Sequence, residues 1–328
     1  MNLLHPADVV AGIDIGGTKT AGALVGADGD VVARAVRDTP ARIGGAAMAQ
    51  TAIELVRELT ETAGAAPVAV GVGAAGVVDQ STGRIRAASD MFVDWAGFPL
   101  GARLSEGLGV PVRVENDVNA FLLGEMSWGA ARGSDVLGVM LGTGVGGALA
   151  LDGHLRHGPH GAAGEIGHTP GYGDAVCTCG MTGHLETLAS GTSIARRYSV
   201  RTGGGGMSAR AVAELARAGD DVARRVFADA GRAVALACVS AATLVDLPLA
   251  VVGGGVAGAW DLLADAVAET LRTDPPVSGA SLKIVPGALR ADAVMLGAAA
   301  LVTPSLFLEP AEGSVDPTES EFVRDRAS

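Results

Sequence analysis

Short apolar runs separated by glycine-bearing turns open the chain. Three runs near the N-terminus are rich in β-branched side chains, and the turn Asp28-Gly29-Asp30 separates the second from the third. Runs of this length bounded by turn residues predict strands joined in a meander. The predicted strands are residues 9–15, 20–25 and 31–36. A strand, a glycine turn and a strand return at residues 136–141 and 148–151, which predicts an internal duplication.

Helical spacing of apolar residues follows the first meander. Between residues 45 and 63, Ala52, Leu55 and Leu59 recur at intervals of three and four, which predicts an amphipathic helix. Asn116 or Asp117 stands where a side chain would cap the next helix. The other predicted helices are 118–128, most of 185–245 with a break at 203–206, 260–271 and 292–301, and the other strands are 68–72, 111–114, 250–255 and 282–285. Strands alternating with helices predict an α/β fold.

Composition and charge narrow the class of protein. The chain has 328 residues, of which 48% are hydrophobic, enough for about two globular domains with buried cores. Its net charge of −12 disfavours phosphate backbones and anionic lipid surfaces, so we expect neither nucleic acid nor a membrane as a partner. The 49 glycines carry no collagen-like period and indicate turns and close backbone approaches instead.

Other features favour a reducing cytoplasm. Three cysteines, two of them a single residue apart, do not make a disulfide framework, and the N-terminal residues MNLLHPADVV lack the features of a signal peptide. The most apolar stretch, residues 233–252, contains Asp246 and Pro248, which predicts a buried helix and strand rather than a membrane span. From residue 302 onward the composition predicts a mobile tail, with six acidic residues and four prolines or glycines.

The second glycine turn matches the G-x-G-x-x-G pattern of dinucleotide-binding proteins through Gly142, Gly144 and Gly147. Glu165 also lies near the distance at which a ribose-binding acid would be sought. In that motif, however, the last glycine opens a helix whose N-terminus meets the pyrophosphate, whereas this sequence continues as a strand. The pattern therefore does not favour NAD.

The segment Asp14-Ile15-Gly16-Gly17-Thr18-Lys19 joins the first two predicted strands in the same manner. Two such hairpins that face each other would offer backbone N–H groups to a polyphosphate. Either turn alone is better explained as an ordinary tight turn. Thr18, Lys19 and Thr143 add side-chain donors that ordinary turns do not need, so together the two hairpins favour a polyphosphate site.

Four potential metal ligands lie within 17 positions in a segment rich in His, Gly and Cys. They are His168, Cys177, Cys179 and His184. Two imidazoles and two thiolates suit tetrahedral Zn²⁺ in a closed structural site, which would stiffen so glycine-rich a loop. The alternative is a pair of buried thiols beside surface histidines.

Six motifs resemble, in order and spacing, those of the ROK family of sugar kinases and repressors. They are DIGGTK (14–19), ENDVNA (115–120), LGTGVGGA (141–148), GEIGH (164–168), CTCGMTGHLE (177–186) and GGGVA (253–257). The resemblance implies an actin/hexokinase-like (ribonuclease H-like) two-domain α/β fold with ATP and sugar in an interdomain cleft. The expected parts are a small lobe of residues 1–117 and about 291–302, a large lobe of residues 118–290 with the zinc-binding loop, and a flexible tail, 303–328.

Asp117 is the candidate catalytic residue. A carboxylate at a helix entrance could accept the proton of a sugar hydroxyl, although a plain N-cap explains it equally well. The resemblance implies catalysis, because Asp117 aligns with the general base of the family's E-N-D-x-N motif. The sugar-binding residues implied in the same way are Gly76, Asn116, Asp117, Glu165, His168 and Glu186.

The resemblance also implies a nucleotide site and a dimer. Asp14 would lie near Mg²⁺ through a water molecule. ATP would contact Gly16, Gly17, Thr18, Lys19, Gly142, Thr143 and Gly144, with Gly254 and Gly255 behind the nucleoside. The zinc motif departs from the family's usual C-x-C-G-x-x-G-C, since His184 stands where the third cysteine is usual. Histidine is a competent ligand, so zinc remains expected. Relatives usually form homodimers, and we expect the same here.

The expected activity is ATP-dependent phosphorylation of the 6-hydroxyl of a hexose, with glucose first because of its frequency in the family. Asp90 lies near a position where glucose kinases often have asparagine, and it would either tolerate an amino group on the sugar or be a solvated loop acid. N-acetylglucosamine, N-acetylmannosamine and an amino-hexose such as kanosamine are therefore alternatives. A sugar-responsive repressor is disfavoured because only thirteen residues precede Asp14. A catalytically dead sugar-binding scaffold is disfavoured because Asp14 and Asp117 are both present.

Overall fold

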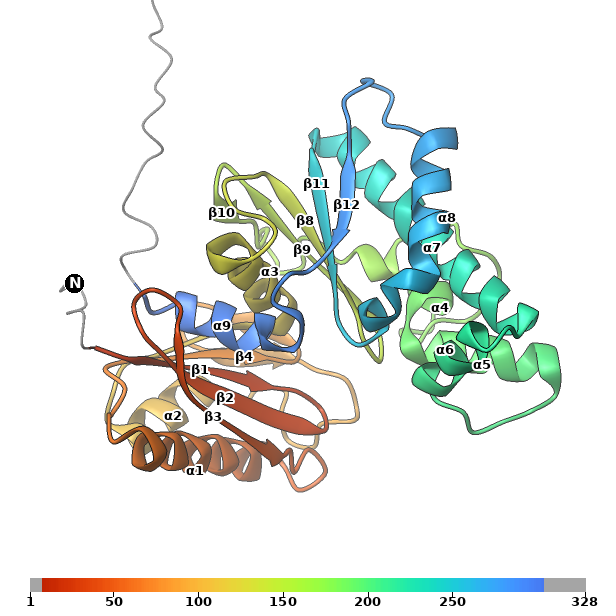
Figure 1. Cartoon of the computed structure of the whole chain (residues 1–328). Helices are drawn as coiled ribbons and strands as arrows, with labels where there is room; N and C mark the ends of the chain where they lie inside the picture. The colour runs from red at the N-terminus through yellow and green to blue at the C-terminus, as the bar shows by residue number, and fades with distance from the viewer. Residues whose placement is uncertain (1–7, 304–328) are drawn as a thin grey trace, which may run out of the picture.

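The computed structural model describes residues 8–303, so residues 1–7 and most of the predicted tail, 304–328, lie outside the described part. Two five-stranded sheets form the framework (Figure 1). The first has the order β3-β2-β1-β4-β7 and the second the order β10-β9-β8-β11-β12. The strands of the first sheet are β1 (Val10–Ile15), β2 (Lys19–Val25), β3 (Val31–Asp38), β4 (Val70–Ala74) and β7 (Val112–Asn116). Those of the second are β8 (Val136–Leu141), β9 (Val145–Leu151), β10 (His154–Leu155), β11 (Leu249–Gly253) and β12 (Lys283–Pro286).

The two sheets share one topology. In each, the second strand in chain order runs antiparallel to the first and the third, and the last two strands run parallel to the first. In each, three residues separate the strands of the first hairpin. The shared order and direction agree with the internal duplication that the sequence predicts.

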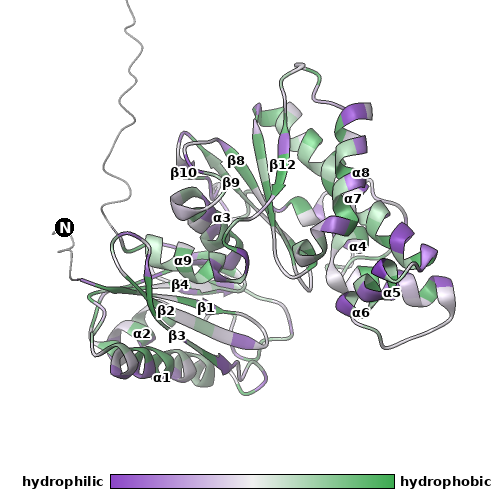
Figure 2. Ribbon diagram, viewed as in Figure 1, coloured by the Kyte–Doolittle hydropathy of each residue, from purple (hydrophilic) through white to green (hydrophobic). Residues whose placement is uncertain are grey.

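Helices cover both faces of the first sheet. Helices α1 (Gly45–Ala63) and α2 (Leu100–Leu108) lie on one face, and α9 (Ala293–Ala300) and α3 (Asp117–Trp128) on the other (Figure 1). Helix α9 is hydrophobic along its length (Figure 2), and all eight of its residues are buried. It lies very close to α3, since a Cβ atom on Gly297 would come 1.7 Å from the carbonyl oxygen of Ala120. Only glycine permits this backbone approach.

Helix α3 links the two sheets, because it packs on β4 and β7 as well as on β8, β9 and β11. Its Phe121 is 2% exposed and lies against Gly253 at the end of β11. Burying a phenylalanine side chain contributes about 1.5–3 kcal/mol. Each sheet also has its own hydrophobic core. We call the first sheet with α1, α9 and the segment between β4 and β7, which includes α2, the first lobe. The second sheet with the helices and loops that connect its strands is the second lobe.

The second lobe contains most of the helices. They are α4 (Glu186–Ala189), α5 (Gly191–Thr202), α6 (Ala209–Arg217), α7 (Asp221–Val245) and α8 (Trp260–Thr273). Among the described helices, α7 alone is long and apolar enough to cross a membrane by length and composition. It packs on α4, α5, α6 and α8, and its Val226, Phe227 and Val234 lie in the core of the second lobe. A buried core helix can have the same length and apolar composition, so these two properties are weak evidence for a membrane span.

Several local features differ from the sequence expectations. Helix α2 was not expected because its two glycines lower its helix propensity, but burial of Leu100 and Leu104 stabilises it. The hairpin of β5 (Val77–Asp79) and β6 (Arg84–Ala87) is too short for a clear pattern. The predicted mobile tail begins too early, because Thr303 is buried and its hydroxyl donates to the carbonyl oxygen of Ala299.

Candidate active site

The entrance of α3 presents the candidate catalytic carboxylate. Of the two possible caps, Asn116 is the one that the structure uses, since its side-chain oxygen accepts from the backbone N–H groups of Val118 (2.9 Å) and Asn119 (3.1 Å). Its amide nitrogen donates to Oδ1 of Asp117 and to the carbonyl oxygen of Gly76, both at 3.0 Å. Asp117 therefore does not serve as the cap, and its half-buried carboxylate is oriented by the residue that does.

Four acidic side chains influence one another in pairs at this entrance. Burial is the main reason that the pKa of Asp117 is raised to about 6, and the nearby charge of Glu165 raises it further. Burial and then the charge of Asp117 raise the pKa of Asp14 to about 7. The pKa of Glu165 is raised by burial and by the charge of Glu186. The structure thus brings together, around Asp117, acids from β1, α3 and the segment after β10.

The first glycine hairpin lies next to Asp14. The backbone N–H of Gly16 donates to the carbonyl oxygen of Lys19 (3.0 Å), which closes the turn between β1 and β2. Gly17 lies under the Met91 side chain, whose terminal carbon would be 2.8 Å from an added Cβ. The Thr18 and Lys19 side chains are exposed, so their donor groups are free to meet a ligand.

The second glycine hairpin lies against the same helix entrance. A Cβ atom on Gly146 would come 2.6 Å from the side chain of Val118, the residue after Asp117. The tip is closed by a hydrogen bond from Gly142 N–H to the carbonyl oxygen of Gly144 (2.9 Å), and the carbonyl oxygen of Thr143 accepts from the Thr192 hydroxyl (2.9 Å). The two hairpins therefore flank Asp117, one through Asp14 and one through Val118.

The remaining glycines of the predicted site border these elements. Gly254 follows β11 with a φ of +84°, and an added Cβ would lie 2.5 Å from the carbonyl oxygen of Leu141, so it packs against the second hairpin. Gly255 faces open space. Gly76, with a φ of +107°, is tied to the α3 entrance by the bond from Asn116 to its carbonyl oxygen.

Glu186 joins the second hairpin to the cysteine loop. It is 7% exposed, and its Oε2 accepts from the backbone N–H of Val145 at 3.0 Å. Its Oε1 accepts from the Thr178 hydroxyl (2.5 Å) and from Cys177 Sγ (3.5 Å). Thr178 was not singled out from the sequence, since a threonine between two cysteines gives no signal of such a contact.

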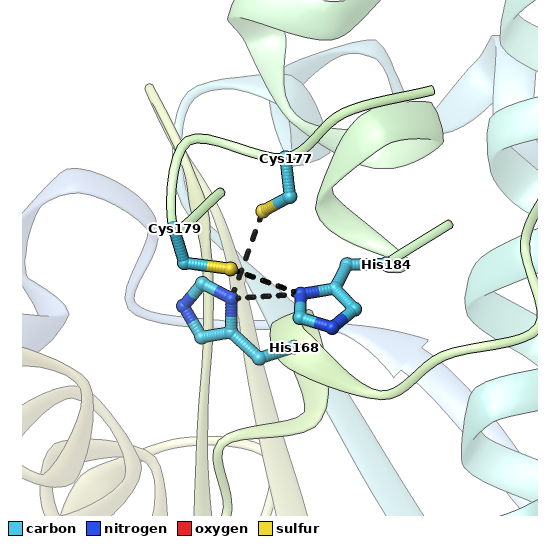
Figure 3. A group of neighbouring side chains, drawn as sticks. All are labelled: His168, Cys177, Cys179 and His184. Atoms are coloured by element: carbon cyan, nitrogen blue, oxygen red, sulfur yellow. Dashed lines mark hydrogen bonds between the residues drawn. The ribbon is translucent and has the colours of Figure 1, made fainter. Parts of the chain in front are cut away.

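Figure 3 shows that the four predicted metal ligands converge. The ligand atoms of His168, Cys177, Cys179 and His184 all lie within 4.8 Å of one another. Nδ1 of His168 is 3.7 Å from Cys177 Sγ and 3.3 Å from Nδ1 of His184, which in turn is 3.2 Å from Cys179 Sγ. Each imidazole thus turns Nδ1 toward the cluster. Two nitrogens and two sulfurs at this spacing fit a tetrahedral Zn²⁺ site.

Two sheets of one topology, with glycine hairpins flanking a carboxylate, define the actin/hexokinase-like class of α/β proteins. The chain belongs to the ROK family, whose model matches residues 10–304. It is 31% identical to a glucokinase of Thermotoga maritima, over 89% of this chain and 96% of that one. It is 33% identical to an N-acetylmannosamine kinase of Escherichia coli, over 88% and 96%. It also resembles the crystal structure of a ROK family glucokinase from Streptomyces griseus in complex with glucose and AMPPNP, with a TM-score of 0.79 and 31% identity over 89% and 98% of the two chains.

Proposed function

We propose that this protein is an ATP-dependent hexose kinase that transfers the γ-phosphate to the 6-hydroxyl of a hexose, with glucose as the first candidate. The proposal rests on the half-buried Asp117 carboxylate, which Asn116 holds in place between two glycine hairpins. The identity to glucokinases and the likeness to a glucokinase structure with glucose and a nucleotide analogue support the assignment.

Asp117 acts as the general base in this proposal. Its pKa of about 6 leaves it ionised at neutral pH and makes it a stronger proton acceptor than an ordinary aspartate. Asn116 fixes the carboxylate so that Oδ2 faces the hydroxyl that loses its proton, since Oδ1 is already bonded. We assign Gly76, Asn116, Glu165, His168 and Glu186 to the sugar hydroxyls.

The two hairpins bind the nucleotide in this proposal. The turns that Gly16 and Gly142 close cradle the phosphates, through the backbone N–H groups of Gly17 and Gly144 and the side chains of Thr18, Lys19 and Thr143. Asp14 lies beside the phosphates, where its carboxylate would hold a water ligand of Mg²⁺. When bound, Mg²⁺ screens the phosphate charge that builds up during transfer. Gly254 and Gly255 back the nucleoside.

We assign a structural Zn²⁺ to His168, Cys177, Cys179 and His184. The two sulfurs and two nitrogens support this assignment, and Cys177 is also close enough to Glu186 to link the metal loop to the second hairpin. Purified protein should retain about one equivalent of zinc, and Cys179→Ser should lose it. Cys238→Ala is the matched control, because Cys238 is buried in α7 away from the cluster. Less than about a tenth of an equivalent in the unmodified protein would remove the assignment.

The choice of sugar needs a direct test. ATP consumption should be measured with glucose, N-acetylglucosamine, N-acetylmannosamine and kanosamine, and kcat/KM compared, because sites matched to hydroxyls discriminate strongly. We expect glucose to give the highest value. A higher value for an N-acetylated or amino sugar would move the assignment to that sugar, and no consumption with any hexose would overturn the proposed function. We also propose a cytoplasmic homodimer, which mass measurement in solution can check.

A further inference from the structure

An ion pair of a buried glutamate and a half-buried histidine lies next to the entrance of α3. Glu115, at the end of β7, is 3% exposed. Its Oε2 accepts from Nε2 of His157 at 2.8 Å. Its Oε1 accepts from the backbone N–H of Asn116 (2.8 Å) and from the Asn119 side chain (2.9 Å), with Gln80 at 3.5 Å. The charged partner of this carboxylate therefore comes from the second lobe, while its neutral partners come from the first lobe and from α3.

Two of the neutral partners of Glu115, Asn116 and Asn119, belong to the turn that carries Asp117. Asn116 orients Asp117, and its backbone N–H is held by Glu115. Asn119 lies in the first turn of α3, and its N–H is one of the two groups that Asn116 caps. A shift of the Glu115 carboxylate would therefore move the residue that fixes Asp117.

His157 anchors the segment that leads to Glu165. Its carbonyl oxygen accepts from the N–H of Ala163 at 3.1 Å, which folds residues 157–163 into a compact loop ending just before Gly164 and Glu165. The same loop touches the first lobe again, since an added Cβ on Gly161 would lie 3.5 Å from Val77 of β5. The loop of the second lobe thus docks on the first lobe at two points, and His157 supplies the polar one.

We propose that His157 is a positioning residue for phosphoryl transfer, because its ion pair with Glu115 holds the Glu165 loop of the second lobe in register with the Asp117 turn. The inference rests on the proposed function. It goes beyond it by assigning a role to a histidine outside the residues that we assign to the nucleotide and the sugar.

The pair should also depend on pH. The hydrogen bond to Glu115 raises the pKa of the His157 imidazole. Burial of Glu115 raises the pKa of its carboxyl, but the hydrogen bonds that this carboxylate accepts outweigh burial and lower that pKa. Both partners are charged between these two pKa values. As the pH rises through the raised pKa of His157, the imidazole loses its charge and the ion pair becomes a weaker neutral hydrogen bond. The charge facing the ring is that of Glu115 on β7, and the other groups on the carboxylate, from α3 and the segment after β5, are neutral amides.

Three variants test the role. His157→Leu removes the donor and leaves a buried carboxylate without a charged partner, which is strongly unfavourable. His157→Gln keeps a neutral N–H donor near the position of Nε2. His160→Gln is the matched control, because His160 is an exposed histidine of the same loop. For each, the melting temperature, kcat, and the KM values for hexose and ATP should be measured between pH 6.5 and 9.

We expect His157→Leu to lower kcat/KM for the hexose about 30-fold or more while the KM for ATP changes less than about threefold. His157→Gln should recover most of that loss at pH 9. We expect the hexose KM of the unmodified protein to rise with pH as His157 loses its charge, and that of His157→Gln to stay constant. Equal behaviour of His157→Leu and His160→Gln would overturn the inference, as would a wild-type pH profile in His157→Gln. Should His157→Leu not fold, the Gln profile still decides. Absence of hexose-dependent turnover in the unmodified protein would instead overturn the proposed function.

Discussion

The first hairpins of the two sheets occupy equivalent places in the duplicated topology, yet they differ in chemistry. The β1–β2 hairpin carries Asp14 at the next-to-last position of its first strand, and the β8–β9 hairpin carries Met140 there. At the tips, Gly17 lies under the flexible Met91 side chain, whereas Gly144 lies against the Glu186 carboxylate. The first hairpin thus carries an acid and a tip covered by an adaptable side chain, whereas the second has no acid there and its tip lies against a buried carboxylate.

This difference shows that one supersecondary unit can be held in two ways. Contacts with Glu186, Thr192 and Gly191 hold the second hairpin in place. The phosphate-binding role that we propose for it needs N–H groups at fixed positions. The charge of Asp117 adds to burial in raising the pKa of Asp14, so an acid at this position is costly, and the second hairpin avoids that cost with Met140. Asp117 lies at the helix entrance between the two hairpins and belongs to neither.

The largest expected effect comes from removing this shared carboxylate. Asp117→Asn should lower kcat by about 10³-fold or more while sugar binding stays near normal, because the amide cannot accept the hydroxyl proton but keeps the size and the bond to Asn116. Turnover and calorimetric sugar binding should be measured on the same preparation. Asp28→Asn, an exposed acid at the β2–β3 turn, is the control.

The pH profile gives a second readout of the same residue. In the unmodified protein, kcat/KM should fall about tenfold per pH unit below a pKa of about 6, because protonated Asp117 cannot accept a proton. Retained turnover in Asp117→Asn would remove its catalytic role, and the hairpins would then have to be explained as binding elements alone.

A matched pair of glycine substitutions tests the difference between the hairpins. An alanine Cβ at Gly144 would meet Oε2 of Glu186 at 2.4 Å, whereas at Gly17 it would meet the end of the Met91 side chain at 2.8 Å. Methionine adapts easily, and a buried carboxylate bound to Val145 does not. We expect Gly144→Ala to raise the KM for ATP about 10-fold or more and Gly17→Ala to change it about threefold or less.

Equal effects of these two substitutions would show that the two hairpins adapt equally well to an added methyl group. That result would contradict the expectation that the contact with Glu186 makes the second hairpin less adaptable. Gly142→Ala serves as the control for backbone freedom, because an added Cβ there meets nothing within 4 Å.

The sequence predicts what depends on local patterns and ordered motifs. Alternating apolar runs with glycine turns located the strands of both hairpins, and the six motifs pointed to the family, which the family match confirms. The four candidate metal ligands were identified by residue type, and the structure brings their ligand atoms within 4.8 Å of one another in one loop. The roles of the individual site residues remain predictions.

The features that the sequence did not predict depend on contacts between distant segments. The pair of Glu115 and His157 joins residues 42 positions apart, and neither residue type nor spacing indicates that one faces the other. Helix α2 is stabilised by packing against α1 and β7 rather than by its own propensity. The hydrogen bonds from Thr178 and Val145 to Glu186 likewise form only when the cysteine loop folds over the second hairpin.

The smallest expected effect concerns stability and isolates the charge that distinguishes the first hairpin. The folded-state pKa of Asp14 is about 7, above the ordinary value of 3.8, so the folded protein loses stability as the pH rises through this interval. Asp14→Asn mimics the protonated acid. At pH 8 its free energy of unfolding, measured by denaturant titration, should therefore exceed that of the unmodified protein by about 1–2 kcal/mol, after allowance for the partial exposure of Asp14. Its turnover should fall. The gain should shrink toward pH 4, where Asp14 is protonated in the folded state. Asp38→Asn, an exposed acid at the end of β3, should give no such gain. An equal stability gain of Asp14→Asn over the unmodified protein at pH 8 and at pH 4 would show that Asp14 carries no electrostatic cost, and that the first hairpin differs from the second, with its Met140, in shape alone.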